Sequence, residues 1–123
     1  MDIVQLGNTD LKVSRLGIGL VEIGLQLTEE NKDQAYNVLN TALEGGINFF
    51  DTAECYGISE DLIGAALSTN RDKFVLATKA GHPSYGTEGV RWHVNTIKKS
   101  IDKSLKRLKT DYVDHFGDIF SSC

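Results

Sequence analysis

Three ionisable side chains stand directly after two short, mostly apolar runs of the sequence. Asp51 and Tyr56 follow the run over 47–50, and Lys79 ends a second run that starts at 74. Such a run is typical of a buried strand that delivers side chains to the rim of a parallel sheet. An ammonium beside a phenol stabilises the phenolate and makes the phenol a better acid. Tyr56 and Lys79 therefore suit acid–base chemistry, with Asp51 available to hold the lysine.

The elements that must position these residues follow from hydrophobic periodicity and turn signals. In chain order, the sequence predicts a hairpin over 3–13, a buried strand over 16–20, a helix from a Thr28 cap to Gly45, a strand over 47–50, a helix from Ser59 to Asn70, a strand over 74–79, a helix over 94–108 and a strand over 112–116. Strands that alternate with helices indicate a parallel sheet with right-handed crossovers. A doubly wound open sheet and part of an eightfold barrel both accept this order, and the chemistry at the strand ends favours the barrel.

Several conspicuous residues have plain structural interpretations. Gly17, Gly19 and Gly24 lack the spacing of a dinucleotide fingerprint, and we expect no helix to open there. Glu60 fits an acidic residue in the first turn of a helix. The helix over 94–108 carries an apolar stripe, which we expect to face inward, and a solvated basic face. The stripe contains Val94, Ile97, Ile101, Leu105 and Leu108, and the basic face contains Lys98, Lys99, Lys103, Lys106 and Arg107.

Composition indicates an ordinary globular chain. The 123 residues, of which 41% are hydrophobic and 24% charged, leave room for a single domain. The net charge of −4 disfavours nucleic acid as a partner and suits a soluble cytoplasmic protein. The sequence has no signal peptide and no membrane-spanning run, so we expect no membrane partner. Cys55 and Cys123 have no metal-ligand spacing and form no disulfide framework, so we expect no metal site and a reducing compartment.

Four segments together resemble the aldo-keto reductases, and the resemblance extends from residue 3 to about residue 114. They are 6–19 (LGNTDLKVSRLGIG), 51–64 (DTAECYGISEDLIG), 75–79 (VLATK) and 104–114 (SLKRLKTDYVD). The resemblance implies a TIM (β/α)8 barrel that uses NADPH to reduce an aldehyde or ketone, a small-molecule carbonyl substrate. By matching position, Tyr56 would be the proton donor, Lys79 its partner and Asp51 the anchor of Lys79. The cofactor would lie near Gly19 and Asp51.

The end of the chain departs from the family pattern. The family places a histidine at the end of the strand that begins here at Tyr112, and this position is Ile119. His115 lies four residues earlier, about 13 Å along a strand at 3.3 Å per residue. Gly117 and Asp118 are poor strand formers. We therefore expect a truncated or divergent tail after about residue 114.

Size leads to the same expectation. A (β/α)8 barrel typically needs about 250 residues, so residues 1–123 are predicted to be a single partial domain, the N-terminal half of the barrel behind a short hairpin. The loops that would hold a cofactor phosphate lie outside this sequence. An open half-barrel exposes sheet edges, which favours a homo-oligomer or a missing C-terminal half as partner. The alternative function is a non-catalytic remnant that acts as an association or ligand-binding module.

Overall fold

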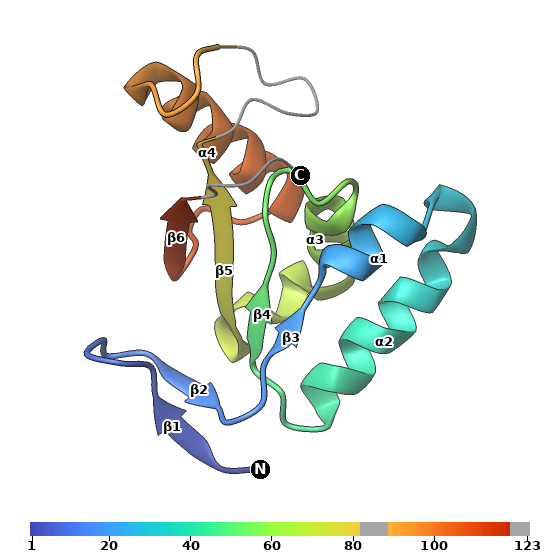
Figure 1. The fold of residues 1–123 in the computed structure, drawn as a ribbon. Coiled ribbons are helices and arrows are strands. Elements are labelled where there is room, and N and C mark those ends of the chain that lie inside the picture. Colours follow the sequence, from blue (N-terminus) through green and yellow to red (C-terminus); the bar gives the residue numbers. More distant parts are fainter. Residues whose placement is uncertain (82–88, 119–123) are drawn as a thin grey trace.

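The computed structural model describes residues 1–81 and 89–118 of the chain. The helices and strands in this part appear in Figure 1. In chain order they are β1 (Ile3–Gln5), β2 (Lys12–Ser14), β3 (Ile18–Gly19), α1 (Val21–Gln26), η1 (Glu29–Asn31), α2 (Lys32–Glu44), β4 (Phe49–Asp51), α3 (Ser59–Leu67), η2 (Ser68–Lys73), β5 (Val75–Ala80), α4 (Val94–Leu108) and β6 (His115–Asp118).

The main sheet of the described residues is parallel, in the order β3-β4-β5-β6. Its register pairs Gly19 with Asp51, Asp51 with Ala77, and Lys79 with Gly117. Neighbouring strands are therefore consecutive in the chain, and each is linked to the next through at least one helix, as the alternation predicts. The hairpin β1-β2 forms a separate antiparallel pair, also as predicted.

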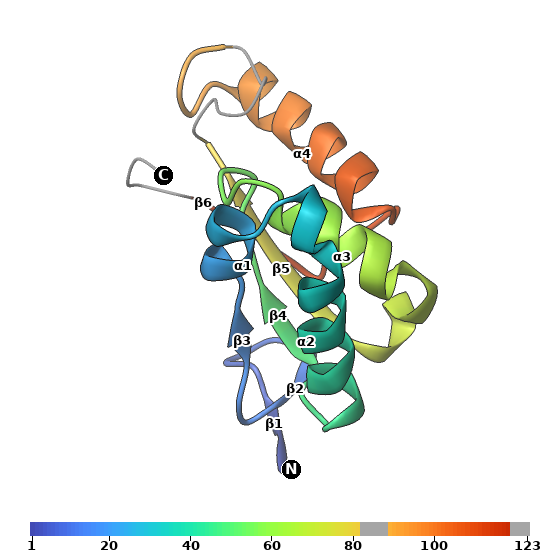
Figure 2. The ribbon, with the colours of Figure 1, turned by 90° about the vertical axis from the view of Figure 1, so that its right-hand side faces the viewer.

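The helices α2, α3 and α4 all line one side of this sheet, as Figure 2 shows. A doubly wound fold would carry helices on both faces. The one-sided arrangement therefore selects the barrel alternative, of which the described strands form a part. The core lies between the sheet and the helices, and its most buried side chains include Leu39, Phe50, Leu62, Leu67 and Leu76.

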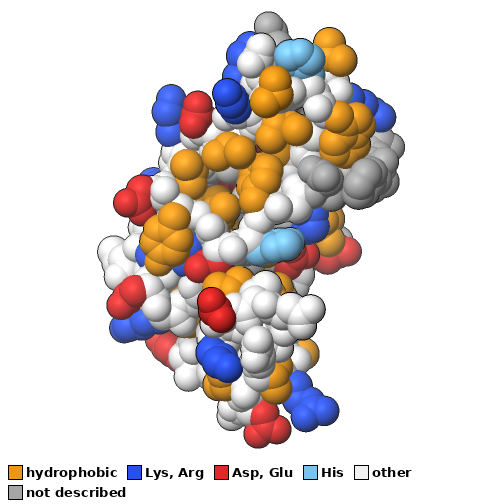
Figure 3. All heavy atoms as spheres, turned by 90° about the vertical axis from the view of Figure 1, so that its left-hand side faces the viewer, with side chains coloured by type: hydrophobic (Ala, Val, Ile, Leu, Met, Phe, Trp, Pro, Cys, Tyr) orange, Lys and Arg blue, Asp and Glu red, His pale blue; other side chains and the backbone are white. Residues whose placement is uncertain are grey.

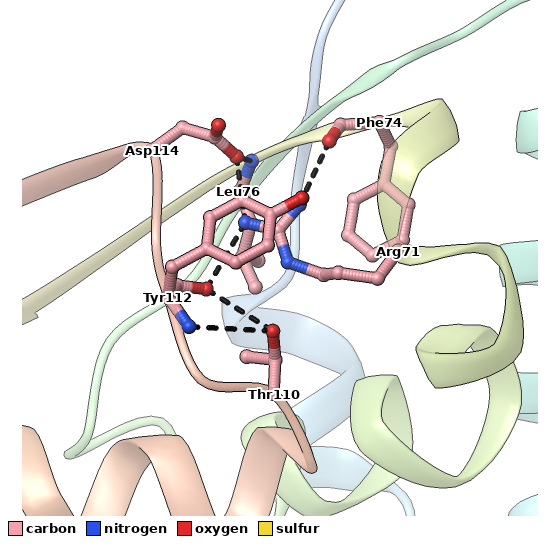
Figure 4. Close-up of polar contacts among 6 residues, drawn as sticks. All are labelled: Arg71, Phe74, Leu76, Thr110, Tyr112 and Asp114. Carbon is pink, nitrogen blue, oxygen red and sulfur yellow. Dashed lines mark hydrogen bonds and ion pairs between the residues drawn. The ribbon is translucent and has the colours of Figure 1, made fainter.

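Arg71 fixes the start of β6 relative to β5. Its guanidinium donates to the carbonyls of Phe74 and Tyr112, at 2.9 and 3.1 Å, and to the Asp114 carboxylate at 2.7 Å (Figure 4). The same carboxylate oxygen accepts the Leu76 N–H, at 2.9 Å. The guanidinium also lies 3.9 Å from the centre of the Tyr112 ring. A single buried arginine thus connects η2, β5 and the chain entering β6.

Three expectations about elements are corrected by the structure. The strand predicted over 16–20 is only Ile18–Gly19, and helix α1 opens directly after it although none was expected. Gly117 and Asp118 do belong to a strand, because parallel pairing with Lys79 and Ala80 supplies their backbone partners.

The third correction concerns the face that α4 buries. Its fully buried positions are Thr96, Ser100, Ser104 and Leu108, so only the last residue of the predicted stripe is fully buried. Ile97, Ile101 and Leu105 are half-buried, and Val94 is 57% exposed. Helices α3 and α4 approach each other closely, since a Cβ on Gly64 would lie 2.2 Å from the carbonyl oxygen of Arg107. The small side chain of Ser104 lies beside Glu60 of α3. Figure 3 shows hydrophobic side chains gathered on the side of the molecule where β6 is the sheet edge.

None of the helices in the described ranges has the length and apolar character that crossing a membrane requires.

Candidate functional site

The predicted site residues lie at the carboxyl ends of neighbouring strands. Asp51 is the last residue of β4, and its neighbour in the register on β3 is Gly19. Lys79 is the last residue but one of β5. Because parallel strands end at the same rim of a sheet, residues that are 28 positions apart in the chain meet here.

Lys79 is held between two oxygens of the β4 segment. Its ammonium donates to the Asp51 carboxylate at 2.8 Å and to the carbonyl of Thr52 at 2.9 Å. The Lys79 side chain is 24% exposed and that of Asp51 42%, so the pair is reachable from solvent. An ammonium has three N–H donors, so one remains to face a third group.

Tyr56 is that neighbouring group. The Lys79 ammonium lies 5.3 Å from the centre of the Tyr56 ring, within the range of a cation–π contact. Among the described residues, no hydrogen bond joins this ammonium to the Tyr56 hydroxyl. The structure thus brings Asp51, Tyr56 and Lys79 together, with the ring rather than the oxygen of Tyr56 in contact with the lysine.

The segment that carries Tyr56 is a tight turn between β4 and α3, over residues 52–58. Tyr56 donates its backbone N–H to the carbonyl of Ala53, and Gly57 follows with a φ of +54°, a left-handed conformation that favours glycine. Gly24 of α1 packs against this turn so closely that a Cβ there would lie 1.8 Å from the carbonyl oxygen of Tyr56. Gly24 therefore serves close packing of α1 against the Tyr56 turn.

A hollow of about 710 Å³ opens on the face of the sheet that the helices leave uncovered. Strand residues form most of its wall, and the tip of the N-terminal hairpin, Leu6 to Thr9, forms the rest. The strand residues are Phe49, Asp51, Ala77, Lys79, His115 and Gly117. The hollow thus combines the ion pair with apolar surface, a combination that suits a small organic ligand.

His115 lies on the wall of this hollow, but closer to the amino ends of the strands than Lys79 of the ion pair. It pairs in register with Ala77, whereas Gly117 pairs with Lys79. His115 therefore lies on the same face of β6 as Gly117, two residues before the level of Lys79. Gly117, at the height of Lys79, has no side chain to offer. Ile119, the expected position of the family histidine, lies outside the described residues, as does His82.

Sequence reasoning missed a buried charged cluster behind the site. Glu60, interpreted from the sequence as an ordinary first-turn acid, is 0% exposed and accepts a hydrogen bond of 2.7 Å from the Thr78 hydroxyl. Burial raises the pKa of Glu60 above its ordinary value, against the opposing effect of Thr78, Ser104 and Arg107. Arg107, which we expected on the solvated face of α4, has a side chain that is 13% exposed. No local signal separates these residues from surface charges, because their burial depends on how α3 and α4 pack.

Cys55, beside Tyr56, is 1% exposed and lies in a small buried cluster with Ala53, against which Tyr56 packs. Cys123 lies outside the described residues.

The rim has the properties that a flat cofactor ring requires. Gly19 is exposed, and no atom lies within 4 Å of the place where its Cβ would be, so the end of β3 leaves open space next to Asp51. A nicotinamide ring could approach the strand end there without a side chain in the way. The residues present therefore fit the cofactor that the resemblance implies, at the nicotinamide end.

Comparison with known proteins agrees with this geometry. The family model described as the Aldo/keto reductase family matches residues 15–117. Among curated proteins, an uncharacterised oxidoreductase, YqkF, of Bacillus subtilis (strain 168) is 44% identical over 89% of this chain and 36% of its own length. The L-galactose dehydrogenase of Arabidopsis thaliana is 40% identical over 97% of this chain and 39% of its own length. The chain therefore spans well under half of these relatives.

Solved structures show the same relationship. The holo form of an aldo-keto reductase from Bacillus halodurans superposes with a TM-score of 0.83 at 36% identity, covering 96% of this chain and 40% of that one. An aldo/keto reductase from Klebsiella pneumoniae, in complex with NADP and acetate, superposes with a TM-score of 0.69 at 27% identity, covering 85% of this chain and 35% of that one.

Proposed function

Because the chain belongs to the aldo/keto reductase family, we propose that it takes part in the NADPH-dependent reduction of an aldehyde or ketone to the alcohol, with Tyr56 as proton donor. Oxidoreductase chemistry in general follows from the family. The cofactor, the donor and the carbonyl substrate are the proposal.

One observation carries it, the placement of the Lys79 ammonium. This ammonium is fixed by the Asp51 carboxylate and the Thr52 carbonyl and lies 5.3 Å from the Tyr56 ring. In the proposed reaction its third N–H turns toward the phenol oxygen and stabilises the negative charge that Tyr56 acquires as its proton leaves. Asp51 holds the ammonium in place.

The other residues bind and orient. Gly19 and Asp51 flank the space in which the nicotinamide would lie, and the apolar wall of the hollow, including Phe49, would hold the substrate. NADPH, when bound, supplies the hydride that the carbonyl carbon receives. Tyr56 supplies the proton that the carbonyl oxygen receives, so hydride and proton together complete the alcohol.

A second candidate is a non-catalytic module that binds a ligand or a partner at the open face. The observation in its favour is that Gly117, which pairs in register with Lys79, offers no side chain to the hollow, and that the expected position of the family histidine is Ile119. Under this alternative the hollow binds small carbonyl compounds or NADPH without turnover.

Substitution of Tyr56 by Phe tests the proposal. With a panel of small aldehydes and ketones, Tyr56→Phe is expected to lower kcat by about 10² to 10⁴, the usual contribution of a positioned acid, while saturable NADPH binding persists. Tyr36→Phe, on α2 away from the strand ends, is the matched control and should keep full activity. Activity in Tyr56→Phe equal to that of the unchanged chain would exclude the donor role. Binding without turnover in the unchanged chain would favour the second candidate.

A further inference from the structure

Arg107 reaches from α4 to the turn that carries Tyr56. Its Nη1 donates to the carbonyl of Glu54 at 3.3 Å, and its Nη2 donates to the carbonyl of Gly57 at 2.5 Å. These two carbonyls stand two residues before and one residue after Tyr56. The guanidinium therefore spans the turn in which the proposed proton donor is placed.

The opposite sides of the same turn are held by backbone contacts. The Glu54 N–H donates to the carbonyl of Lys79, at 3.1 Å, and the Ile58 N–H donates to the carbonyl of Gly24, also at 3.1 Å. The first of these bonds ties the turn to the very residue whose ammonium contacts Tyr56. Arg107 supplies the remaining support, from the helix layer, and so opposes any movement of the turn away from β5.

Two carboxylates of α3 orient the guanidinium. Asp61 Oδ2 accepts from Arg107 Nε at 3.2 Å and lies 3.1 Å from Nη2, and Glu60 Oε2 lies 3.5 Å from Nη1. A charge as buried as this one needs such partners. The planar fork of arginine serves both carboxylates and both carbonyls at once, which the single ammonium of lysine does not do.

We propose that Arg107 is a positioning residue for Tyr56. It acts through the carbonyls of Glu54 and Gly57 and so keeps the phenol beside the Lys79 ammonium. The inference rests on the proposed function for its catalytic consequence. Its structural part, the hold of Arg107 on the turn, stands independently of turnover.

The test compares Arg107→Lys with Arg71→Lys in the full 123-residue chain. Arg71 is a matched control, because it too is buried, donates to two backbone carbonyls and pairs with a carboxylate, but lies away from the Tyr56 turn. Amide hydrogen exchange of residues 54–59 is measured by NMR, together with kcat, the KM for the carbonyl substrate and the unfolding midpoint.

Arg107→Lys is expected to speed exchange at Glu54, Tyr56 and Ile58 by about 10- to 100-fold, as expected when charge-assisted hydrogen bonds are lost. It should lower kcat by a similar factor while the KM changes less than about threefold, because misplacement of the donor affects the transition state rather than substrate binding. Arg71→Lys should lower the unfolding midpoint without selective acceleration of these amides.

Exchange in Arg107→Lys that stays within twofold of the unchanged chain overturns the inference. So does equal acceleration in Arg71→Lys, since the effect would then be general loss of stability. If Arg107→Lys does not fold, Asp61→Asn decides, because Asp61 is partly exposed and its loss removes one of the two carboxylates that orient the guanidinium. Exchange at Glu54, Tyr56 and Ile58 should then rise, and exchange within twofold of the unchanged chain overturns the inference. An unchanged chain that never turns over carbonyls refutes the proposed function, while the exchange result still decides whether Arg107 holds the turn.

Discussion

At the scale of single residues, the exposure of charged side chains distinguishes the proposed site, with Lys79 and Asp51, from the buried cluster around Glu60. Lys79 and Asp51 are partly exposed and can meet a ligand, whereas Glu60 is fully buried among Thr78, Ser104 and Arg107. The first pair can change partners during a reaction. The buried carboxyl cannot, so its role is to hold α3 and α4 in their mutual arrangement, and its titration affects stability rather than chemistry.

Replacement of Glu60 by Gln should change how stability depends on pH. The folded-state pKa of Glu60 lies above its ordinary value of 4.5, chiefly because of burial, with the charge of Glu54 adding to the effect. Between these two pKa values the folded protein binds more protons than the unfolded chain, so this group's contribution to stability decreases as pH rises through that window. The Glu60→Gln variant has no group that titrates at this position, so its stability lacks this dependence on pH.

Thermal unfolding midpoints of both proteins, measured from pH 4 upward, check this prediction. The midpoint of Glu60→Gln minus that of the unchanged chain should increase as pH rises through the window and then level off. Asp33→Asn, on the exposed side of α2, is the control and should show no such trend. A difference that stays flat, or that decreases with rising pH, would contradict the assigned direction.

At the scale of elements, the proposed site depends on the contact between α1 and the turn over 52–58. Gly24 lies in α1, and its lack of a side chain lets the helix reach the Tyr56 carbonyl. The Ile58 N–H then finds its acceptor in the Gly24 carbonyl. Helix α1 has only 6 residues and no side-chain cap, so packing rather than helix propensity keeps it formed.

Gly24→Ala is therefore expected to destabilise the fold by about 1–3 kcal/mol, the usual cost of overpacking, because its Cβ would also lie 2.7 Å from the Cβ of Ser59. Gly19→Ala is the matched control. No atom lies within 4 Å of its new methyl group, and its stability should change by less than about 0.5 kcal/mol. Urea unfolding measures both, and equal midpoints for the two variants would refute the packing argument.

At the scale of the whole molecule, the described sheet has open edges at β3 and β6 and an uncovered face. On the β6 side, the apolar stripe of α4 adds Val94, which is 57% exposed, and the half-buried Ile97 and Ile101. Unpaired strand edges and a contiguous apolar patch favour association with another chain. The hydrophobic surface seen in Figure 3 is thus the place where a partner or a second copy would be stabilised most.

The 123-residue chain should consequently self-associate at micromolar concentration, and a double Val94→Lys/Ile101→Lys variant should shift the average mass measured by light scattering toward the monomer. Val4→Lys/Val38→Lys is the matched control, because these exposed residues lie on the hairpin and on α2. A monomeric unchanged chain, or an equal shift in the control, would show that the stripe is not an association surface.

The sequence by itself determined the alternation of strands and helices and the residues that stand at the strand ends. The alternation and the strand-end positions of Asp51 and Lys79 depend on neighbours within a few residues, and local periodicity records such neighbours directly. Thr28, predicted as the cap of the helix that ends at Gly45, caps η1 instead, and Asn31 is the N-cap of α2. The hairpin and the parallel order follow from the same local signals. The meeting of Asp51 and Lys79 then follows from parallel pairing alone.

Only the tertiary structure decided which charges are buried and which faces pack. Glu60 and Arg107 look like surface residues in sequence, and α4 looks as though it buries its larger apolar stripe. The close contact of α3 and α4 at Gly64 brings Arg107 next to Glu60 and Asp61, and only the last residue of the stripe, Leu108, is fully buried. Helix α1 likewise packs against the Tyr56 turn through Gly24. Periodicity shows that a segment has an apolar face, but not which distant segment packs against it or which charges are buried with it, so these depended on the fold.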